Sequence, residues 1–346
     1  MNDHNKTFIA FVKLGTFLTN FCSSNTNEDN WSQKLNDAIT LAGHHNGWFT
    51  QENILFSLKN WSELLTKESL KQWLSTYNIE ANTPKKVASI MAGNIPLVGF
   101  HDFLATLITD NSVMVKSSSN DKVLLPFLAS YLIDIEPSLK ENIHFTENKL
   151  ENFDAVIATG SNNTARYFEH YFSKGPNIIR KNRNSVAVLT GEETTEELKA
   201  LGEDIFRYYG LGCRSVSKLF VPKGYDFTLF FESVYNYNPI INQAKYANNY
   251  DYNKAVYLMS EFKILENGFL MLKEDESYAS PIASLFYEYY DSVEGLKKNL
   301  INESEKIQCI VAKGIFDNEI PFGETQKPSL GDYADGIDTV EFLLKV

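Results

Sequence analysis

The stretch PKKVASIMAGNIP, residues 84–96, decides the fold of this chain. Its apolar run predicts a buried strand over 86–92, and the Gly-Asn pair and the proline that follow end this strand. A helix is expected next, over 99–109, and a second short buried strand over 112–116. A strand, a turn, a helix and another strand in this order predict a parallel α/β sheet.

The same alternation continues toward the C-terminus. The further elements expected are a helix over 123–133, strands over 143–145 and 155–158, a helix over 164–171, a strand over 185–189, a helix over 195–209 and a strand over 216–222. Strands that alternate with helices predict parallel pairing with right-handed crossovers. Because ligands bind such sheets at the carboxyl ends of the strands, Asn94, Lys116 and the Gly160-Ser161 pair are expected at a binding edge.

Length and periodicity predict two domains. Residues 5–77 show helical spacing of apolar side chains, with a capped helix start at Thr66. The chain has 346 residues, and 43% of them are apolar. This length is greater than one hydrophobic core usually supports. We expect a helical segment and a nucleotide-binding domain over 1–180, a second α/β domain over 181–330, and a C-terminal segment over 331–346 that is available for oligomerisation.

The overall composition excludes several classes of protein. The net charge is −12, from 44 acidic and 32 basic residues, and such a surface repels nucleic acid and anionic lipid. No run approaches the ~20 apolar residues that span a bilayer, and the N-terminus lacks a secretory signal pattern. The three cysteines form no CxxC pair, and the histidines show no metal-ligand spacing. A cytoplasmic protein without a structural metal is therefore expected.

The stretch YYGLGCRS, residues 208–215, is the main candidate for chemistry. A cysteine follows a glycine-rich turn between a predicted helix and a predicted strand, and glycine allows the backbone to approach a ligand closely. Arg214 lies next to Cys213, and a nearby cation favours the reactive thiolate. The sequence leaves a second interpretation open, because most free cysteines are small, buried packing residues.

Five short motifs together resemble a known superfamily. Gly210-Leu211-Gly212-Cys213 is similar to the nucleophile loop of aldehyde dehydrogenases. The segments 94–96 (NIP), 113–116 (VMVK) and 158–161 (ATGS) resemble, in order, that superfamily's strand-end asparagine, cofactor lysine and pyrophosphate turn. The segments 321–326 (PFGETQ) and 329–339 (SLGDYADGIDT) resemble the C-terminal signature of LuxC-type acyl-CoA reductases. The resemblance runs from about residue 85 to the C-terminus, and the helical N-terminal part fits it loosely.

This resemblance implies an aldehyde-dehydrogenase-like fold, with a Rossmann-type parallel nucleotide-binding sheet and an α/β catalytic domain. It also implies that Cys213 carries the acyl group and that Asn94, with the backbone N–H of Cys213, stabilises the oxyanion. The alternative interpretation of Asn94 is an ordinary turn asparagine near a proline.

The cofactor site follows from the same resemblance. It implies cofactor contacts at Lys116, Ser117, Ser119, Gly160 and Ser161. Ser119 stands where NAD-using relatives carry a glutamate that holds the ribose, and a serine donates to a 2′-phosphate that a carboxylate would repel. NADPH is therefore the expected cofactor. Composition alone leaves Lys116 as an ordinary surface charge.

One departure from the superfamily concerns water activation. Oxidative aldehyde dehydrogenases carry a glutamate that activates water to hydrolyse the acyl-enzyme. The matching stretch here, residues 178–185 (IIRKNRNS), has no carboxylate. Without a positioned base, hydrolysis of the thioester is slow. The basic residues Arg180, Lys181 and Arg183 either bind CoA or NADPH phosphates or form a solvated loop.

The predicted function is therefore NADPH-dependent reduction of an acyl-CoA, of fatty type, to the aldehyde. The resemblance also implies a homo-oligomer and a partner protein that activates or transfers acyl groups. Two alternatives stay open: a non-catalytic scaffold that binds nucleotide or protein, and a glutamate-5-semialdehyde-type reductase of acyl phosphates.

Overall fold

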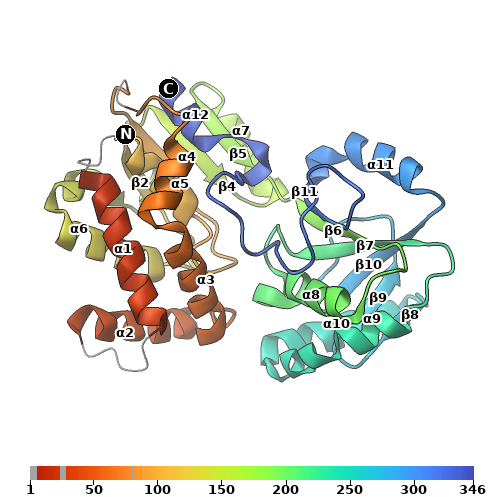
Figure 1. The fold of residues 1–346 in the computed structure, drawn as a ribbon. Helices are drawn as coiled ribbons and strands as arrows, with labels where there is room; N and C mark the ends of the chain where they lie inside the picture. Colours follow the sequence, from red (N-terminus) through yellow and green to blue (C-terminus); the bar gives the residue numbers. More distant parts are fainter. Residues whose placement is uncertain (1–5, 24–28, 80–81) are drawn as a thin grey trace. The chain divides into compact units, whose positions relative to one another are not determined.

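The computed structural model describes residues 6–23, 29–79 and 82–346 (Figure 1). The chain divides into two compact units. Unit 1 comprises Met1–Lys181 and Ser329–Val346, and unit 2 comprises Asn182–Pro328. The chain leaves unit 1 after Lys181 and returns to it at Ser329.

Four helices open unit 1, as the apolar spacing over 5–77 predicted. They are α1 (Lys6–Ser23), α2 (Asn30–His45), α3 (Gln51–Leu64) and α4 (Lys67–Leu74). The predicted helix start at Thr66 is confirmed, because its hydroxyl accepts a hydrogen bond of 3.1 Å from the Ser69 N–H and caps α4. Phe11, Leu14 and Leu18 are fully buried on one face of α1, so this helix packs through an apolar stripe.

A five-stranded parallel sheet forms the centre of unit 1, in the order β3-β2-β1-β4-β5. Its strands are β1 (Lys86–Ile90), β2 (Ser112–Lys116), β3 (Ile143–Phe145), β4 (Ala155–Thr159) and β5 (Asn177–Arg180), and the helices beside them are α5 (Phe100–Ile108), α6 (Leu124–Ile135) and α7 (Asn162–Phe172). The predicted parallel α/β sheet is confirmed, and β5 is a strand that the sequence did not predict. The strand order reverses between β1 and β4, which is the position where open α/β sheets bind ligands.

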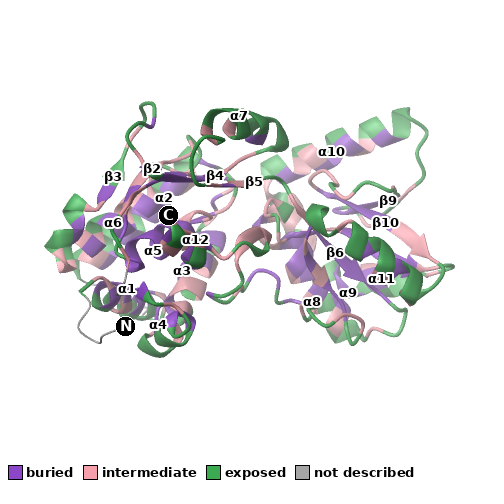
Figure 2. Cartoon of the chain, turned by 90° about the horizontal axis from the view of Figure 1, so that it is seen from above, coloured by how far each residue is buried: buried purple, intermediate pink, exposed green. Residues whose placement is uncertain are grey.

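Different helices cover the two faces of this sheet. Val87 and Val113 face a large core that α5, α6 and the opening helices share. Ala88 and Val156 face the other side, where Phe168 of α7 packs against them. Figure 2 shows the buried strands beside α7, whose outer surface is exposed. The sheet that bears the carboxyl ends of β1, β2 and β4 therefore has α5, α6 and the opening helices on one face and α7 on the other.

A buried ion pair ties three elements of unit 1 together. The Arg180 guanidinium at the end of β5 pairs with the Asp102 carboxylate of α5, and it donates a hydrogen bond of 3.0 Å to the Thr339 hydroxyl of α12 (Thr339–Lys345). Arg180 is only 6% exposed. The interpretation of Arg180 as a phosphate-binding or solvated side chain is therefore wrong, because its charge is held inside the unit.

The C-terminal segment packs inside unit 1. The Tyr333 hydroxyl accepts a hydrogen bond of 2.7 Å from the Trp73 indole and lies 2.8 Å from the Tyr77 hydroxyl. Val340 and Leu343 of α12 are fully buried. Part of the apolar surface of this segment is thus buried within the chain, although Ile337 is exposed, and its role in oligomerisation stays a prediction.

Unit 2 is built on a six-stranded sheet in the order β11-β6-β7-β10-β9-β8, in which only the β8–β9 pair is antiparallel. Its strands are β6 (Asn184–Val188), β7 (Val216–Pro222), β8 (Ile264–Glu266), β9 (Met271–Glu274), β10 (Ser284–Tyr290) and β11 (Ile307–Val311), and its helices are α8 (Thr195–Phe206), α9 (Thr228–Ser233), α10 (Ala244–Met259) and α11 (Val293–Asn302). The predicted β6, α8 and β7 are confirmed. The elements from α9 onward were not predicted.

His101 provides a test of packing in unit 1. Its ring lies beside Trp73 and Tyr333, and its Nε2 atom is 2.9 Å from the Leu330 carbonyl oxygen. Burial lowers the pKa of His101 below its usual 6.5, against opposing effects of Asp102 and the Leu330 carbonyl. The unfolded chain therefore takes up a proton that the folded chain resists.

We expect the free energy of unfolding to fall as the pH drops below 6.5, and to be unaffected by His101 above that value. The substitution His101→Gln keeps a donor for the Leu330 carbonyl but does not titrate, so it should flatten this part of the profile. Urea unfolding between pH 5 and pH 8 measures the effect, with His45→Gln at an exposed position as the control. A parental slope that survives in His101→Gln would contradict the assignment.

Candidate active site

The turn after β1 carries Asn94, which is exposed. Its neighbour Gly93 lies so close to the loop after β2 that an added Cβ atom would stand 2.7 Å from the Ser118 Cβ atom. A glycine is thus required for these two loops to meet. Buried Asn46 joins them as well, because its side-chain amide donates to the carbonyl oxygens of Gly93 and Asn120, each at 3.4 Å.

A carboxylate also holds the Asn94 turn. Asp121 accepts a hydrogen bond of 3.4 Å from the backbone N–H of Leu97, a residue with a φ of 58°. Burial raises the pKa of Asp121 to about 6, in opposition to the backbone hydrogen bonds that it accepts. Half-buried Asp121 therefore links its own loop to the Asn94 turn through one carboxylate oxygen.

The structure places Lys116, Ser117 and Ser119 at the end of β2 and in the loop that follows. The Lys116 ammonium donates to the Asn148 carbonyl at 3.2 Å in an exposed position, and Ser119 is also exposed. The Ser117 hydroxyl oxygen is buried and has no hydrogen-bond partner among the residues that the structure describes. A buried hydroxyl without a partner is uncommon in folded proteins, so this atom is a candidate for contact with a ligand.

Gly160 and Ser161 connect β4 to α7. The Ser161 hydroxyl accepts a hydrogen bond of 3.3 Å from the Thr164 N–H and caps α7, while the residues of this first turn are exposed. A Cβ atom on Gly160 would come within 3.1 Å of Thr164 and Phe168, so glycine keeps the backbone close to the helix. Exposed N–H groups and the helix dipole make such an end a site for a phosphate.

These unit 1 residues fit a dinucleotide cofactor. Six predicted site residues lie at or after the carboxyl ends of the adjacent strands β2, β1 and β4: Asn94, Lys116, Ser117, Ser119, Gly160 and Ser161. The exposed N-terminus of α7 suits a pyrophosphate, and the unpaired Ser117 hydroxyl and the Lys116 ammonium are donors suited to a phosphorylated ribose. The chain brings together in one unit every cofactor residue that the sequence predicted.

Cys213 belongs to unit 2 and lies in a turn directly before β7. The predicted helix over 195–209 ends earlier, at Phe206, because Tyr208 and Tyr209 adopt left-handed φ values of 54° and 59°. Gly210 follows with a φ of 74°. These three residues reverse the chain after α8 and deliver Cys213 to the start of the strand.

The Cys213 turn is closed by its own backbone and anchored by side chains. The Ser215 N–H donates to the Gly212 carbonyl at 3.0 Å, so Cys213 and Arg214 occupy the centre of a β-turn. The Ser185 hydroxyl of β6 donates to the Cys213 carbonyl at 2.9 Å. On the other side, the Arg214 Nε donates to the Thr325 carbonyl at 2.7 Å.

The sequence does not predict these anchors. The segment 321–326 was noticed as a signature, but nothing in the sequence connected it to the Cys213 turn. Spacing gives no sign of a contact over more than a hundred residues, and within the segment only Pro321 and Gly323 indicate a tight local conformation.

The three cysteines differ in accessibility. Cys213 is exposed, Cys22 is half-buried and Cys309 is buried. Burial raises the pKa of the Cys22 thiol, which disfavours its thiolate. The interpretation of Cys213 as a buried packing residue is therefore wrong.

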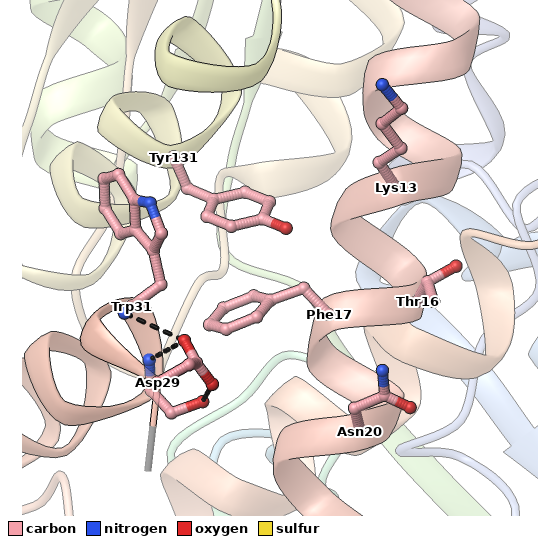
Figure 3. Close-up of a pocket in the computed structure, with 8 residues that line it drawn as sticks. Lys13, Thr16, Phe17, Asn20, Asp29, Trp31 and Tyr131 are labelled. Atoms are coloured by element: carbon pink, nitrogen blue, oxygen red, sulfur yellow. Dashed lines mark hydrogen bonds between the residues drawn. The ribbon is translucent and has the colours of Figure 1, made fainter. Parts of the chain in front are cut away.

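The described parts of the chain offer neither a metal site nor a membrane-spanning helix, and they contain one notable cavity away from the site residues. Residues 6–23, 29–79 and 82–346 contain no group of three His, Cys, Asp or Glu side chains placed to hold a metal ion. No described helix combines the length and the apolar composition needed to cross a bilayer. A cavity of about 330 Å³ opens between α1, α2 and α6, where Phe17, Trp31 and Tyr131 face one another (Figure 3). None of the site residues described above lines it.

Comparison with known sequences gives a family match. The sequence model described as acyl-CoA reductase (LuxC) matches residues 28–230. The chain is 23% identical to the long-chain acyl-protein thioester reductase of Aliivibrio fischeri, over 65% of this chain and 50% of that protein. It is 21% identical to long-chain acyl-protein thioester reductase 2 of Photobacterium leiognathi, over 59% and 46%. The chain spans about half the length of these curated relatives.

Solved structures with a similar fold are aldehyde dehydrogenases. Aldehyde dehydrogenase 21 from Physcomitrella patens aligns with a TM-score of 0.66 at 10% identity, over 98% of this chain and 83% of that one. The enzyme from Bacillus cereus, solved with NAD+, aligns with a TM-score of 0.61 at 13% identity, over 91% and 73%. The predicted aldehyde-dehydrogenase-like α/β fold is confirmed.

Accessibility predicts the order in which the three thiols react. With iodoacetamide at pH 8, the native protein should be alkylated at Cys213 first, and at Cys22 and Cys309 only after unfolding, because a thiolate must be exposed to react. Peptide mass mapping after timed quenching measures the three rates. Equal rates for Cys213 and Cys309 in the folded protein would show that the Cys213 turn is not as accessible as described.

Proposed function

The chain belongs to the LuxC family of acyl-CoA reductases, and from this premise we propose that it reduces an acyl thioester to the aldehyde through an acyl group carried on Cys213. One observation carries the proposal: within the family match over 28–230, an exposed thiol lies in a turn that is anchored on both sides. A nucleophile needs this combination of access and fixed position.

The proposed chemistry of Cys213 has two parts. Its thiolate attacks the acyl carbon, the bond from that carbon to the CoA sulfur breaks, and CoA leaves as the thiol after it takes a proton. The acyl group is then a thioester of Cys213. The backbone N–H of Cys213 and the amide of Asn94 are the proposed donors to the carbonyl oxygen as it gains negative charge. After reduction of the same carbon, the Cys213 sulfur departs and the aldehyde is released.

We propose NADPH as the cofactor, which when bound supplies the hydride. Gly160, Ser161 and the first N–H groups of α7 would hold its pyrophosphate, and Lys116, Ser117 and Ser119 its phosphorylated ribose. Residues 116–119 contain no carboxylate, and Asp121 accepts a hydrogen bond from the Leu97 N–H of the neighbouring turn. A 2′-phosphate therefore meets donors and a cation at this edge, which favours NADPH over NADH.

The lack of a carboxylate in the stretch that matches the water-activating glutamate of oxidative relatives supports reduction over hydrolysis. Residues 177–188, which form β5, its connection and β6, contain no carboxylate. Arg180 is held by Asp102, and Lys181 pairs with Glu169 at 2.6 Å. Water thus has no positioned base in this stretch, and a positioned base contributes typically ~10²–10⁴-fold to such a step. A thiol such as CoA exchanges with the acyl-enzyme without that help.

The acyl donor and the assembly complete the proposal. The acyl-CoA and an acyl group on a protein thiol present the same reacting bond, and the matched relatives are named for the acyl-protein form. We propose an acyl-CoA of fatty type as donor, a partner protein that activates or transfers acyl groups, and a homo-oligomer.

The decisive experiment follows the acyl group. Incubation with a long-chain acyl-CoA in the absence of NADPH should add one acyl mass to the peptide that contains Cys213, and addition of NADPH should then release aldehyde. Cys213→Ser should lose both label and turnover, because a hydroxyl is a far weaker nucleophile than a thiolate. Cys309→Ser, which alters a buried thiol, serves as the control.

Each alternative function predicts a different outcome. Turnover with acyl phosphates alone would favour a glutamate-5-semialdehyde-type reductase. Turnover with a protein-bound acyl group but not with acyl-CoA would move the donor to the partner protein. If no thioester labels Cys213 and none supports NADPH oxidation, the result would indicate a non-catalytic scaffold.

Cofactor preference is tested at Ser119. The parent should show a higher kcat/KM with NADPH than with NADH, and Ser119→Glu should lower the value for NADPH by about 10-fold or more, because a carboxylate repels the 2′-phosphate. Ser119→Ala is the matched control, since it removes the hydroxyl without adding charge. Equal use of both cofactors by the parent would contradict the proposed contacts at this loop.

A further inference from the structure

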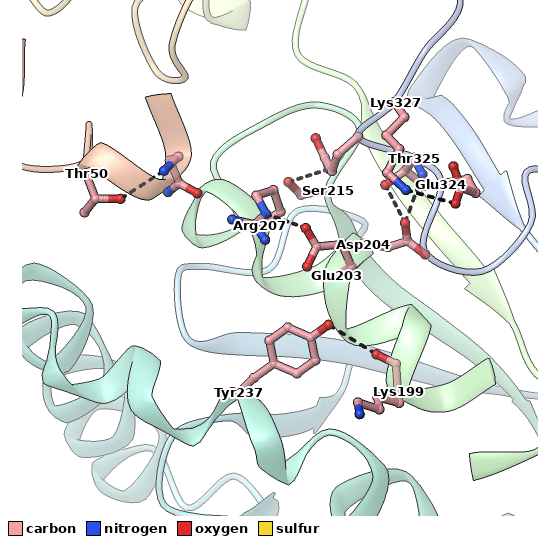
Figure 4. Close-up of polar contacts among 12 residues, drawn as sticks. Thr50, Lys199, Glu203, Asp204, Arg207, Ser215, Tyr237, Glu324, Thr325 and Lys327 are labelled. Atoms are coloured by element: carbon pink, nitrogen blue, oxygen red, sulfur yellow. Dashed lines mark hydrogen bonds and ion pairs between the residues drawn. The ribbon is translucent and has the colours of Figure 1, made fainter. Parts of the chain in front are cut away.

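The segment 321–326, here called the strap, is fixed by one buried carboxylate. Asp204 of α8 is fully buried, and its two oxygens accept three hydrogen bonds from the strap: 2.7 Å from the Gly323 N–H, 2.9 Å from the Thr325 N–H and 2.8 Å from the Thr325 hydroxyl. Figure 4 shows the Asp204 and Thr325 side chains directed at each other. Three donors on one carboxylate fix both the position and the direction of the strap.

The backbone of the strap packs tightly against α8 at Gly323. This residue has a φ of 85°, and a Cβ atom added to it would lie 3.1 Å from the Ala200 Cβ atom on α8. Thr325 is fully buried, while Glu324 between them faces outward and pairs with Lys327 at 3.1 Å. The strap therefore presents one face to Asp204 and the other to solvent.

The strap also holds the turn that carries Cys213. The carbonyl of Thr325 accepts a hydrogen bond of 2.7 Å from the Arg214 Nε, and the Gln326 amide donates to the Ser215 hydroxyl at 3.3 Å. Arg214 and Ser215 are the two residues directly after Cys213. The hydrogen bonds thus run from Asp204 through the strap to the turn, and all of these residues lie in unit 2.

We propose that Asp204 is a positioning residue for Cys213: it fixes the strap, and the strap fixes the turn from which the thiol reacts. The proposal rests on the proposed role of Cys213 as the acyl carrier. Asp204 does not touch the reacting atoms. It restricts the directions from which the thiol meets an acyl carbon, and a small misplacement of a reacting group is costly in rate.

The test compares Asp204→Asn with the parent in the full-length chain. The amide keeps the shape of the carboxylate but turns one acceptor into a donor that faces an N–H group of the strap. Hydrogen–deuterium exchange in peptides covering the Cys213 turn should become about 10- to 100-fold faster, as expected when a buried hydrogen bond to a charged acceptor is lost. Peptides from α11 should exchange as in the parent.

A second measurement separates positioning from general damage. Acylation of Cys213 by long-chain acyl-CoA should slow about 10- to 100-fold, because it needs orientation. Alkylation of Cys213 by iodoacetamide should change by less than about 2-fold, because a small reagent approaches an exposed thiol from many directions. The affinity for NADPH should stay at the parental value.

Matched variants keep the proposal testable if Asp204→Asn fails to fold. Thr325→Val removes one hydrogen bond to Asp204, and Gln326→Met removes the link to Ser215 without touching Asp204. Both variants should speed hydrogen exchange in the Cys213 turn and slow acylation of Cys213, each by a smaller factor than Asp204→Asn. Glu324→Gln, which removes an outward carboxylate from the same strap, should produce none.

Two outcomes would overturn the proposal. In the first, the strap exchanges faster in Asp204→Asn while the Cys213 turn does not. In the second, acylation and alkylation slow by the same factor. A parent that is never acylated would instead refute the proposed function, and the exchange data would still decide whether Asp204 holds the Cys213 turn.

Discussion

Parallel pairing of β1 between β2 and β4 is the constraint on which the rest of unit 1 depends. Because all three strands run in the same direction, the loops that follow them must emerge at one edge of the sheet. This brings Asn94, Lys116 and Ser161 to that edge although more than sixty residues separate the first from the last. Asn46 and the missing side chain of Gly93 then hold two of these loops together.

The sequence predicted those features that depend on local pattern. Apolar runs bounded by Gly, Asn and Pro located β1, β2 and β4, and helical spacing located α1 to α4. The Cys213 turn was also visible, because its glycines and the neighbouring helix and strand are adjacent in the chain. Periodicity failed from α9 onward. The helix α10 buries one face, but apolar residues such as Met259 are exposed on its other faces, so its sequence shows no clear apolar stripe.

Long-range contacts were the part that the sequence did not reveal. Arg180 stands in a basic run that is typical of an exposed loop, yet its charge is neutralised by Asp102, which lies 78 residues away. Asp204 is one of four acidic residues on α8, and nothing in the sequence indicates that it accepts three hydrogen bonds from a segment near the C-terminus. Ion pairs and buried hydrogen bonds of this kind follow from the tertiary fold, and residue spacing does not encode them.

Two carboxylates near the site residues serve similar purposes. Burial raises the pKa of both Asp121 and Asp204 to about 6, and each accepts backbone N–H groups from a neighbouring loop or segment. Asp121 thereby holds the turn that bears Asn94, and Asp204 holds the segment that anchors the Cys213 turn. Asp204 is fully buried, so it is not placed to take a proton from an attacking water. Both carboxylates thus make the segments that bear or anchor the site residues more rigid. The 177–188 stretch contains no carboxylate that could activate water. This is consistent with the proposed acyl thioester, which would persist until it is reduced or returned to a thiol.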